Sequence, residues 1–548
     1  MKTIRTLLAG LALAALSQVP AQAFCGFYAG KADAHLFNEA SQVVLVRDGN
    51  RTVLSMRNDY KGPLKEFALV VPTPTTLQKG QVRIADSLVF DRLDAYSSPR
   101  LAEYRDEDPC KLNFAWGQPP IPYPVAMASP MARAAPLEDQ IARNKALGVT
   151  VELQYTLEEY DIVSLSATQS DGLETWLHEN GYSVPQGASA ALKPYINQGM
   201  KFFVAKVNLQ EQAKTGYTTL RPLQFAFESE KFMLPLRLGM LNAPPDKPQD
   251  LIVYALTQQG RVESSNYRTV KLPANVNLPF FTKPKFQDVY KALFDNQASK
   301  EQHRVVFTEY FWDMGWCDPC AAEPLSSKEL RDSGVFWVGG NAEAQFDAMR
   351  APAGSPSPKI MLPPGGGAQP VVLTRLHVRY TANTFPEDLM FTQTRDRQNW
   401  QTRYVIQQPY DSSVAACSSQ MAQADCEGLC KTRVDSVLRD LQGSDRFGFY
   451  DSYRGKNPAE LQSACVAACT VSKQSGIEAA ARYYQQSLPQ RLHSEKQTLA
   501  ELTGWGLARI DQMPDARKYS AQGSREPVRP VIQPKTWWER LFSFNLLR

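Results

Sequence analysis

The sequence predicts an α+β fold, in which strand-rich N-terminal and central domains are followed by a disulfide-stapled C-terminal helical hairpin. Up to about residue 410, short apolar segments with period-two alternation end at Gly, Pro, Asn or Asp, which is typical of half-buried strands. From about residue 411, apolar residues and cysteines recur instead at three- and four-residue spacing, which is typical of amphipathic helices. The hydrophobic fraction of 43% is enough to bury full-sized cores, so the cysteines are not needed to replace one.

Residues 1–23 have the pattern of a secretory signal peptide. Two basic residues precede a short apolar run, and Ala21-Gln22-Ala23 forms a small-x-small cleavage site. The apolar run is shorter than the roughly 20 residues that a membrane span needs. A lipoprotein signal needs a small residue before the cysteine, but Phe24 precedes Cys25. We therefore predict a periplasmic or secreted protein that starts near Phe24 and has no transmembrane segment after removal of the signal.

The charge balance argues against two classes of partner. The formal net charge of the whole chain is +4, and removal of the two basic residues in 1–23 leaves +2. A nearly neutral chain of this length has no electrostatic basis for binding nucleic acid or anionic membranes. The sequence identifies no partner, and another protein of the cell envelope is the class that export allows.

Changes in composition along the chain define the expected domains. Segments rich in Pro and Ala, and later in Pro and Gly, separate the strand-rich regions. About 525 residues remain after removal of the signal, which allows roughly two to four domains. The expected units are the signal peptide 1–23, a strand-rich N-terminal block 24–115, a Pro/Ala-rich linker 116–136, a mixed α+β domain 137–350, a Pro/Gly linker 351–370, a strand pair packing on the central domain 371–410, a helical hairpin region 411–508 and a polar tail with an aromatic C-terminus 509–548.

The first two structured units are expected to be rich in strands. The segment 41–56 alternates around Asp48-Gly49-Asn50, which favours a tight hairpin. The strand 67–74 ends in prolines, which cannot donate a hydrogen bond to a strand ladder. In the central domain, periodicity predicts strands at 149–155, 201–209, 223–228, 250–256 and 304–312, and helices at 173–181 and 286–294.

The segment 371–380 alternates strongly and places Leu373, Arg375, His377 and Arg379 on one face. We expect the segment 403–407 to return as its partner strand. His377 is interpreted as a packed or edge residue rather than a ligand. Arg375 and Arg379 have two open interpretations, because they could bind an anion or pair with carboxylates on a neighbouring strand.

The nine cysteines fall into three groups, and the first group brackets the N-terminal block. A bridge between Cys25 and Cys110 would tie the new N-terminus to the end of that block. In the chain-entropy model, closing a loop of that length contributes about 4–5 kcal/mol. We therefore predict a structural disulfide between these two residues.

The helical region contains two Cys-x3-Cys pairs. Residues at i and i+4 lie on one face of a helix, so two antiparallel helices would join Cys426 to Cys469 and Cys430 to Cys465. Zinc is the rival use of four cysteines, but structural zinc sites usually have their cysteines in turns. An oxidising compartment also favours disulfides. We predict two structural bridges, with Cys417 either free or paired elsewhere.

The third group is Trp316-Cys317-Asp318-Pro319-Cys320, which follows an expected strand. It resembles the thioredoxin active-site motif, and that resemblance implies Cys317 as nucleophile, Cys320 as resolving thiol and Trp316 and Pro319 as framing residues. However, Ser326 and Glu329 form a capping-box pattern that starts the next helix several residues later. The cysteines then lie in a turn without a helix dipole, which favours a local disulfide or rigid turn. Redox chemistry and metal binding remain alternatives.

No complete set of catalytic or cofactor-binding residues is present in the sequence. Its histidines are scattered, and it contains no His-Glu-x-x-His pair, no Gly-x-Ser-x-Gly elbow, no phosphate loop and no dinucleotide fingerprint. The acidic clusters 106–108 and 158–161 lack calcium-loop spacing and are interpreted as solvated faces. We therefore predict no metal, no cofactor and no catalytic residue. The predicted function is that of an exported binding or scaffold protein, with a thiol-disulfide oxidoreductase acting through Cys317 and Cys320 as the alternative.

Several longer motifs stand out along the chain, and they are Cys25–Tyr28, Ser41–Gly49, Phe67–Pro72, Gly315–Ala321, Thr374–Tyr380, Phe385–Phe391 and Asp396–Tyr404. Together they resemble a bacterial family known as domain of unknown function 2330. The resemblance covers roughly residues 24–410 and implies an exported protein without an assigned activity. Similar proteins often carry a C-terminal membrane segment, and Trp537–Arg548 is not such a segment.

Overall fold

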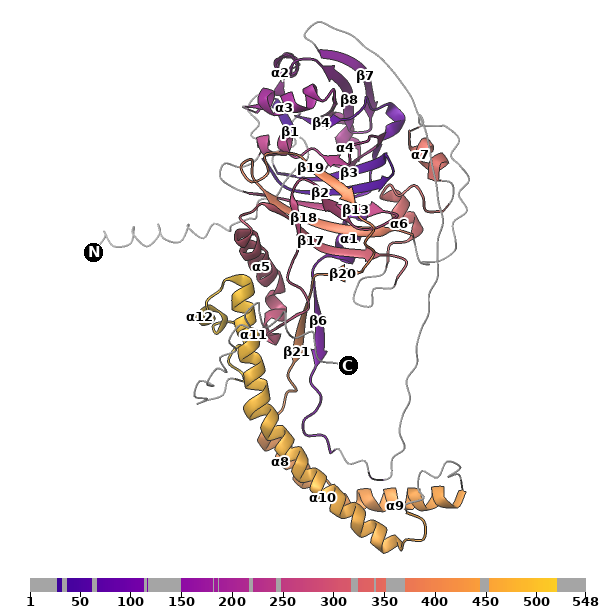
Figure 1. The fold of residues 1–548 in the computed structure, drawn as a ribbon, viewed down its shortest axis with the longest axis vertical. Helices are drawn as coiled ribbons and strands as arrows, with labels where there is room; N and C mark the ends of the chain where they lie inside the picture. The colour runs from indigo at the N-terminus through magenta and orange to yellow at the C-terminus, as the bar shows by residue number, and fades with distance from the viewer. Residues whose placement is uncertain are drawn as a thin grey trace, which may run out of the picture.

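The computed structural model has a body of stacked sheets and helices and a long helical arm that runs away from it (Figure 1). Strand-rich segments precede the arm along the chain, so the predicted α+β class is confirmed. The signal peptide, Cys25, Cys317–Cys320, most of both linkers and Trp537–Arg548 lie outside the described residues. The structure describes residues 27–31, 37–61, 67–112, 116, 149–180, 182–185, 187–215, 220–242, 248–316, 324–339, 342–350, 370–443 and 453–519.

The largest element of the body is a nine-stranded mixed sheet. Its strands, in order across the sheet, are β15 (Arg268–Lys271), β17 (Val305–Asp313), β18 (Val372–Tyr380), β13 (Gln249–Thr257), β2 (Phe37–Asp48), β3 (Arg51–Lys61), β11 (Leu223–Glu228) and β5 (Val82–Ile84), with β20 (Trp400–Gln401) beside β17. The predicted hairpin at 41–56 is confirmed as β2 and β3. Gly49 in its turn has a φ of +56°, a backbone conformation that favours glycine.

A six-stranded sheet packs against one face of the nine-stranded sheet. Its strands, in order, are β7 (Val149–Leu157), β8 (Tyr160–Ala167), β10 (Lys201–Val207), β4 (Phe67–Thr73), β1 (Phe27–Lys31) and β9 (Tyr182–Ser183). A continuous apolar core fills the space between the two sheets, with Val43 and Leu45 on one side and Ile162 and Phe203 on the other. Both sheets therefore contain strands from before and from after the 116–136 segment.

Helices cover the outer faces of both sheets and give the body four layers. The six-stranded sheet is covered by α2 (Ser170–Glu179) and α3 (Ala188–Asn197). The nine-stranded sheet is covered by α1 (Ser87–Ser97), α5 (Phe286–Lys300), α6 (Ser327–Asp332) and α7 (Ala342–Arg350). The smaller elements of the body are α4 (Leu209–Thr215), η1 (Lys79–Gln81), η2 (Arg237–Asn242), η3 (Phe280–Lys285) and the paired strands β12 (Met233–Leu234), β19 (Leu389–Gln393) and β14 (Val262–Ser264).

A small parallel sheet connects the body to the arm. It consists of β16 (Val276–Leu278), β21 (Arg403–Gln408) and β6 (Arg100–Arg105), and the last two leave the body side by side (Figure 1). The arm contains α8 (Val414–Gln423), α9 (Cys426–Gly443), α10 (Pro458–Arg482), a π-helical turn η5 (Tyr483–Ser487), α11 (Leu488–Thr503) and α12 (Leu507–Ile510). Because α10, η5 and α11 follow one another without a break, a single long helix spans the arm and reaches the body.

One predicted strand pairing is wrong. The segment 403–407 was expected to pair with 371–380, but β21 pairs with β16 and β6. The reason is that β18 lies between β17 and β13, which satisfy the hydrogen bonds of both its edges. The predicted helices at 173–181 and 286–294 are present as α2 and α5, and α5 continues to Lys300.

Candidate functional site

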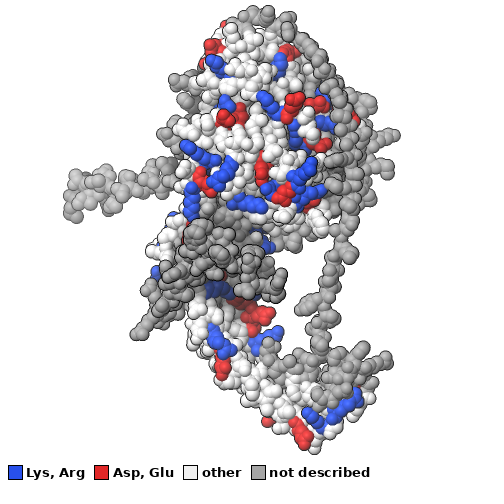
Figure 2. All heavy atoms as spheres, in the orientation of Figure 1, with Lys and Arg blue, Asp and Glu red and all other residues white. Residues whose placement is uncertain are grey.

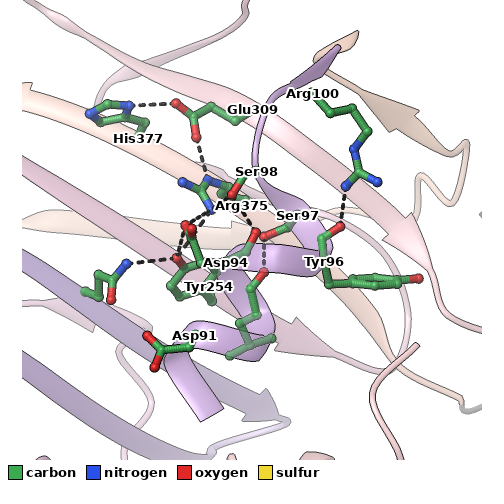
Figure 3. A network of polar contacts seen from close by, with 12 residues as sticks. Asp91, Asp94, Tyr96, Ser97, Ser98, Arg100, Tyr254, Glu309, Arg375 and His377 are labelled. Atoms are coloured by element: carbon green, nitrogen blue, oxygen red, sulfur yellow. Dashed lines mark hydrogen bonds and ion pairs between the residues drawn. The ribbon is translucent and has the colours of Figure 1, made fainter. Parts of the chain in front are cut away.

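A buried polar network lies between the nine-stranded sheet and helix α1 (Figure 3). It extends to helix α5 through Tyr290 and Asp295. Three of its members, Arg375, His377 and Arg379, come from alternate positions of β18. Their location on one face of the strand was predicted from the sequence. Several ionisable side chains meet there with shifted pKa values, so the network is a candidate for chemistry.

Glu309 is at the centre of the network, and a β-bulge places it there. The register between β17 and β18 shifts between Thr308 and Tyr310, so Glu309 has no partner in the ladder. Its side chain is 1% exposed and contacts His377 and Arg375 at 2.6 and 2.5 Å, and it also accepts a hydrogen bond from Tyr290. Burial alone would raise the pKa of Glu309, but the positive charges of His377 and Arg375 outweigh it and lower the pKa to about 2.

His377 lies between two carboxylates. Its Nδ1 is 2.6 Å from Oε1 of Glu309, and its Nε2 is 3.2 Å from Oδ1 of Asp250 on β13. The imidazole ring also stacks on Phe294 of α5, with 3.8 Å between the ring centres. Burial disfavours the charged ring, but Glu309 and Asp250 outweigh this effect and raise the pKa of His377. The ring is therefore held as an imidazolium that donates from Nδ1 to Glu309 and forms an ion pair with Asp250.

Each arginine of β18 joins a helix to the sheet. Nη1 of Arg375 donates to Asp94 of α1 at 2.6 Å, and the Tyr254 hydroxyl donates to the same carboxylate oxygen at 3.0 Å. Arg379 makes a bidentate contact with Asp250, with both N–O distances at 2.7 Å, and pairs with Asp295 of α5. The two arginines therefore pair with carboxylates, which decides between the two interpretations that the sequence left open.

The arrangement is suited to holding elements together rather than to binding a substrate. Glu309, Arg375 and His377 are all buried, whereas a general acid or base must contact the group with which it reacts. One hollow of the described surface lies between α5 and α12 and borders the network at Asp295, and another lies along residues 511–518. Neither is lined by Glu309, Arg375 or His377. In the described part of the chain, no group of three His, Cys, Asp or Glu residues could hold a metal ion.

The arm carries the predicted pair of staples. Disulfides join Cys426 to Cys469 and Cys430 to Cys465, with Cα–Cα distances of 5.8 and 5.7 Å, so this part of the prediction is confirmed. This pairing makes α9 and α10 antiparallel. The four cysteines are buried and, together with residues such as Val434 and Leu461, form the small core between the two helices.

A third disulfide joins Cys110 to Cys417 and corrects the predicted bridge from Cys25 to Cys110. Cys110 follows β6, which leaves the body toward the arm, and Cys417 lies on α8, which packs against α10. The error came from assuming that Cys110 closes a compact N-terminal block, whereas the chain at this point has already left the body. The bridge ties the arm to the segment that connects it to the body.

The arm meets the body at Asp106, directly after β6. Nη1 and Nη2 of Arg491 on α11 donate to the two oxygens of Asp106 at 2.8 and 2.9 Å, and the Tyr483 hydroxyl also donates to this carboxylate. Nη2 of Arg491 additionally donates to the carbonyl of Gln407 on β21. We call this group of Asp106, Gln407, Tyr483 and Arg491 the joint.

The structure supports only part of the interpretation of the Cys317–Cys320 motif, because those residues lie outside the described part. The predicted capping box is confirmed. The Ser326 hydroxyl accepts a hydrogen bond from the backbone N–H of Glu329, the Glu329 carboxylate accepts one from the backbone N–H of Ser326, and α6 starts at Ser327. Trp316, the last described residue before the motif, is 56% exposed.

Sequence reasoning missed Glu309, Asp250 and Asp94. A usable signal was present for Glu309, because a carboxylate within the apolar run of 305–312 needs a buried partner. No comparable signal marked Asp106 as the attachment point of the arm, or Cys417 as the partner of Cys110.

Residues 19–392 match the model of a family described as uncharacterized protein conserved in bacteria, domain of unknown function 2330. No curated protein and no solved structure matches the chain. Across the described ranges, no helix combines the length and the apolar character that crossing a membrane requires.

Proposed function

The chain belongs to this family of uncharacterized bacterial proteins, and we propose that it is an exported cell-envelope protein that binds or scaffolds another envelope protein through its stapled arm. The observation that carries the proposal is the arm itself. It extends from the body (Figure 1), and its outer part, α9 and α10, is held together by two disulfides. Disulfides of this kind are typical of proteins in oxidising compartments outside the cytoplasm.

The apolar core of the outer arm is small, and the two staples add to its stability. In the chain-entropy model, bridges across 43 and 35 residues contribute about 4 kcal/mol each. A two-helix unit that packs on only a few apolar residues would otherwise be marginal in water. The disulfides therefore allow the arm to keep a fixed shape at a distance from the body, which suits the presentation of a surface to a partner.

The charge distribution supports a protein partner more than nucleic acid. Figure 2 shows blue and red side chains interspersed over the visible face of the body, with no large area of one sign. Nucleic-acid binding depends on a continuous basic surface that releases counterions. The interspersed charges on the visible face of the body do not form such a surface.

Site-specific photocrosslinking in cells tests the proposal. Val471 on α10 and Leu88 on α1 are matched positions, because they are 67% and 65% exposed apolar residues on the arm and on the body. A photoreactive amino acid at position 471 should give a discrete adduct with an envelope protein, and one at position 88 should not. An adduct only at position 88, or a catalytic turnover that a point mutation abolishes, would overturn the proposal.

A thiol-disulfide oxidoreductase acting through Cys317 and Cys320 is the second candidate. The exposed Trp316 favours it, because an accessible aromatic residue borders the cysteine pair. The start of α6 at Ser327 opposes it, because this helix begins ten residues after Cys317 and a helix dipole acts only near its first turn. A redox titration should find an easily reduced bond if this candidate is correct. A bond that resists millimolar reductant in the folded protein would exclude it.

A further inference from the structure

Glu495 on α11 is a buried carboxyl group without a hydrogen-bond partner. Its side chain is 3% exposed, and neither oxygen has a partner in the described structure. It lies on the same face of the helix as Leu488, Leu492 and Leu499, which pack toward the body. An ionised carboxylate in such a place loses its hydration and gains no hydrogen bond in return, which favours the neutral form.

The nearest cation does not neutralise Glu495. Nε of Arg491 is 3.5 Å from Oε1 of Glu495, but the two terminal nitrogens of Arg491 bind Asp106. The charge of Asp106 itself disfavours a second negative charge nearby. Burial therefore raises the pKa of Glu495 from its ordinary value of 4.5 to about 7, with Arg491 opposing and Asp106 reinforcing the shift.

Several ionisable groups on the elements around α11 have partners of their own. Tyr483 on η5 binds Asp106, and Arg403 on β21 donates to Asn275. Lys300 on α5 donates to the carbonyl of Glu501, and Lys496 on α11 pairs with Asp511. Among the others, Asp295 on α5 pairs with Arg379, Tyr404 on β21 is buried against Phe286, and His493 on α11 is exposed. The strand β16, Val276–Leu278, contributes no ionisable side chain.

Glu495 adjoins the joint. The π-helical turn η5 lies just before α11, and π-helical turns are frequent at functional sites. It presents Tyr483 to Asp106, and Tyr484 donates to the carbonyl of Tyr410. The segment from Tyr483 to Glu495 therefore contains the contacts that hold the long helix against the ends of β6 and β21.

We propose that Glu495 makes the attachment of the arm to the body dependent on pH. With a neutral carboxyl group at Glu495, α11 docks on the body and Arg491 pairs with the ionised Asp106. Loss of the proton to solvent leaves a negative charge in this contact that competes with Asp106 for Arg491, and the docking weakens. Because the docked state binds this proton more tightly, docking is strongest below about pH 4.5 and weakens as pH rises through about 7.

Hydrogen exchange of α11 at pH 6 and pH 8, corrected for the intrinsic rate of amide exchange, tests this proposal. The full chain is used without any partner, so the outcome is separate from that of the proposed function. Protection of residues 488–503 should fall about tenfold from pH 6 to pH 8 in the wild type. This factor follows from a carboxyl group whose pKa is 4.5 when α11 is undocked and about 7 when it is docked.

Glu495→Gln should change less than twofold between the same pH values, because the titrating group is gone. Glu501→Gln is the matched control, since Glu501 is an exposed glutamate on the same helix, and it should keep the tenfold change. Glu495→Leu, which continues the leucine face, replaces Glu495→Gln if the glutamine variant does not fold. A wild type that changes less than twofold, or a Glu495 variant that keeps the tenfold change, would overturn the proposal.

Discussion

Oε1 of Glu309 lies 2.6 Å from Nδ1 of His377, although the two residues are 68 positions apart in the chain. The contact exists because a bulge in β17, the strand beside β18, leaves Glu309 unpaired and turns its side chain onto the helix-covered face of the sheet. It joins the ion pairs that hold α1 and α5 on that sheet. The body is therefore fixed by a buried charge network as well as by its apolar cores.

Replacing Glu309 should destabilise the body strongly. Glu309→Gln leaves Arg375 and His377 without their shared carboxylate, and breaking a buried pair of this kind costs about 3–5 kcal/mol. The free energy of unfolding in urea measures the loss. Glu478→Gln, at an exposed pair with Arg482 on α10, is the control and should cost less than about 1 kcal/mol. A loss below about 1 kcal/mol for Glu309→Gln would mean that the network does not stabilise the body.

The protonation of His377 should add to stability at low pH. Its pKa is raised in the folded protein, so the contribution is complete below the ordinary value of 6.5 and disappears as pH rises through the folded value. We expect the unfolding free energy to decline across this range in a Glu495→Gln background, which removes a second buried group whose pKa lies near neutrality. A His377→Phe variant that shows the same decline would contradict the assignment.

Peptide mapping of the non-reduced protein should recover Cys110 linked to Cys417. The link to Cys25 is excluded because Cys110 is already bonded within the arm connection. A recovered peptide that joins Cys25 to Cys110 would show that the described pairing is incorrect. The same map reports the state of Cys317 and Cys320.

Removing one staple should loosen the arm and leave the body intact. The double variant Cys430→Ser/Cys465→Ser loses a bridge worth about 4 kcal/mol in the chain-entropy model. Limited proteolysis should then cut α9 and α10 first, whereas the strands of the body stay resistant. Equal resistance of the arm in the variant and the wild type would show that the apolar contacts alone are sufficient.

Local rules predicted much of the fold, because they act within a few residues. The i, i+4 spacing predicted the pairing of Cys426 with Cys469, and Ser326 with Glu329 predicted the start of α6. Alternation placed Arg375 and His377 on one face of a strand. Each of these features depends on the geometry of a single helix or strand.

The features that escaped prediction depend on contacts between distant parts of the chain. Cys110 and Cys417 are separated by 307 residues, and no local pattern records their approach. The bulge at Glu309 depends on the register between β17 and β18, and the position of β21 depends on both edges of β18 being occupied. The assembled sheet determines which strands pair and in which register, because several pairings satisfy the same local alternation.

The crosslinking yield at position 471, compared between the wild type and Cys430→Ser/Cys465→Ser, tests the central claim most directly. If the stapled arm presents the binding surface, the wild type should give a discrete adduct with an envelope protein, and the variant should lose most of it while its body remains folded. An adduct of equal yield in both proteins would contradict the claim, because the staple would then have no part in presenting the surface.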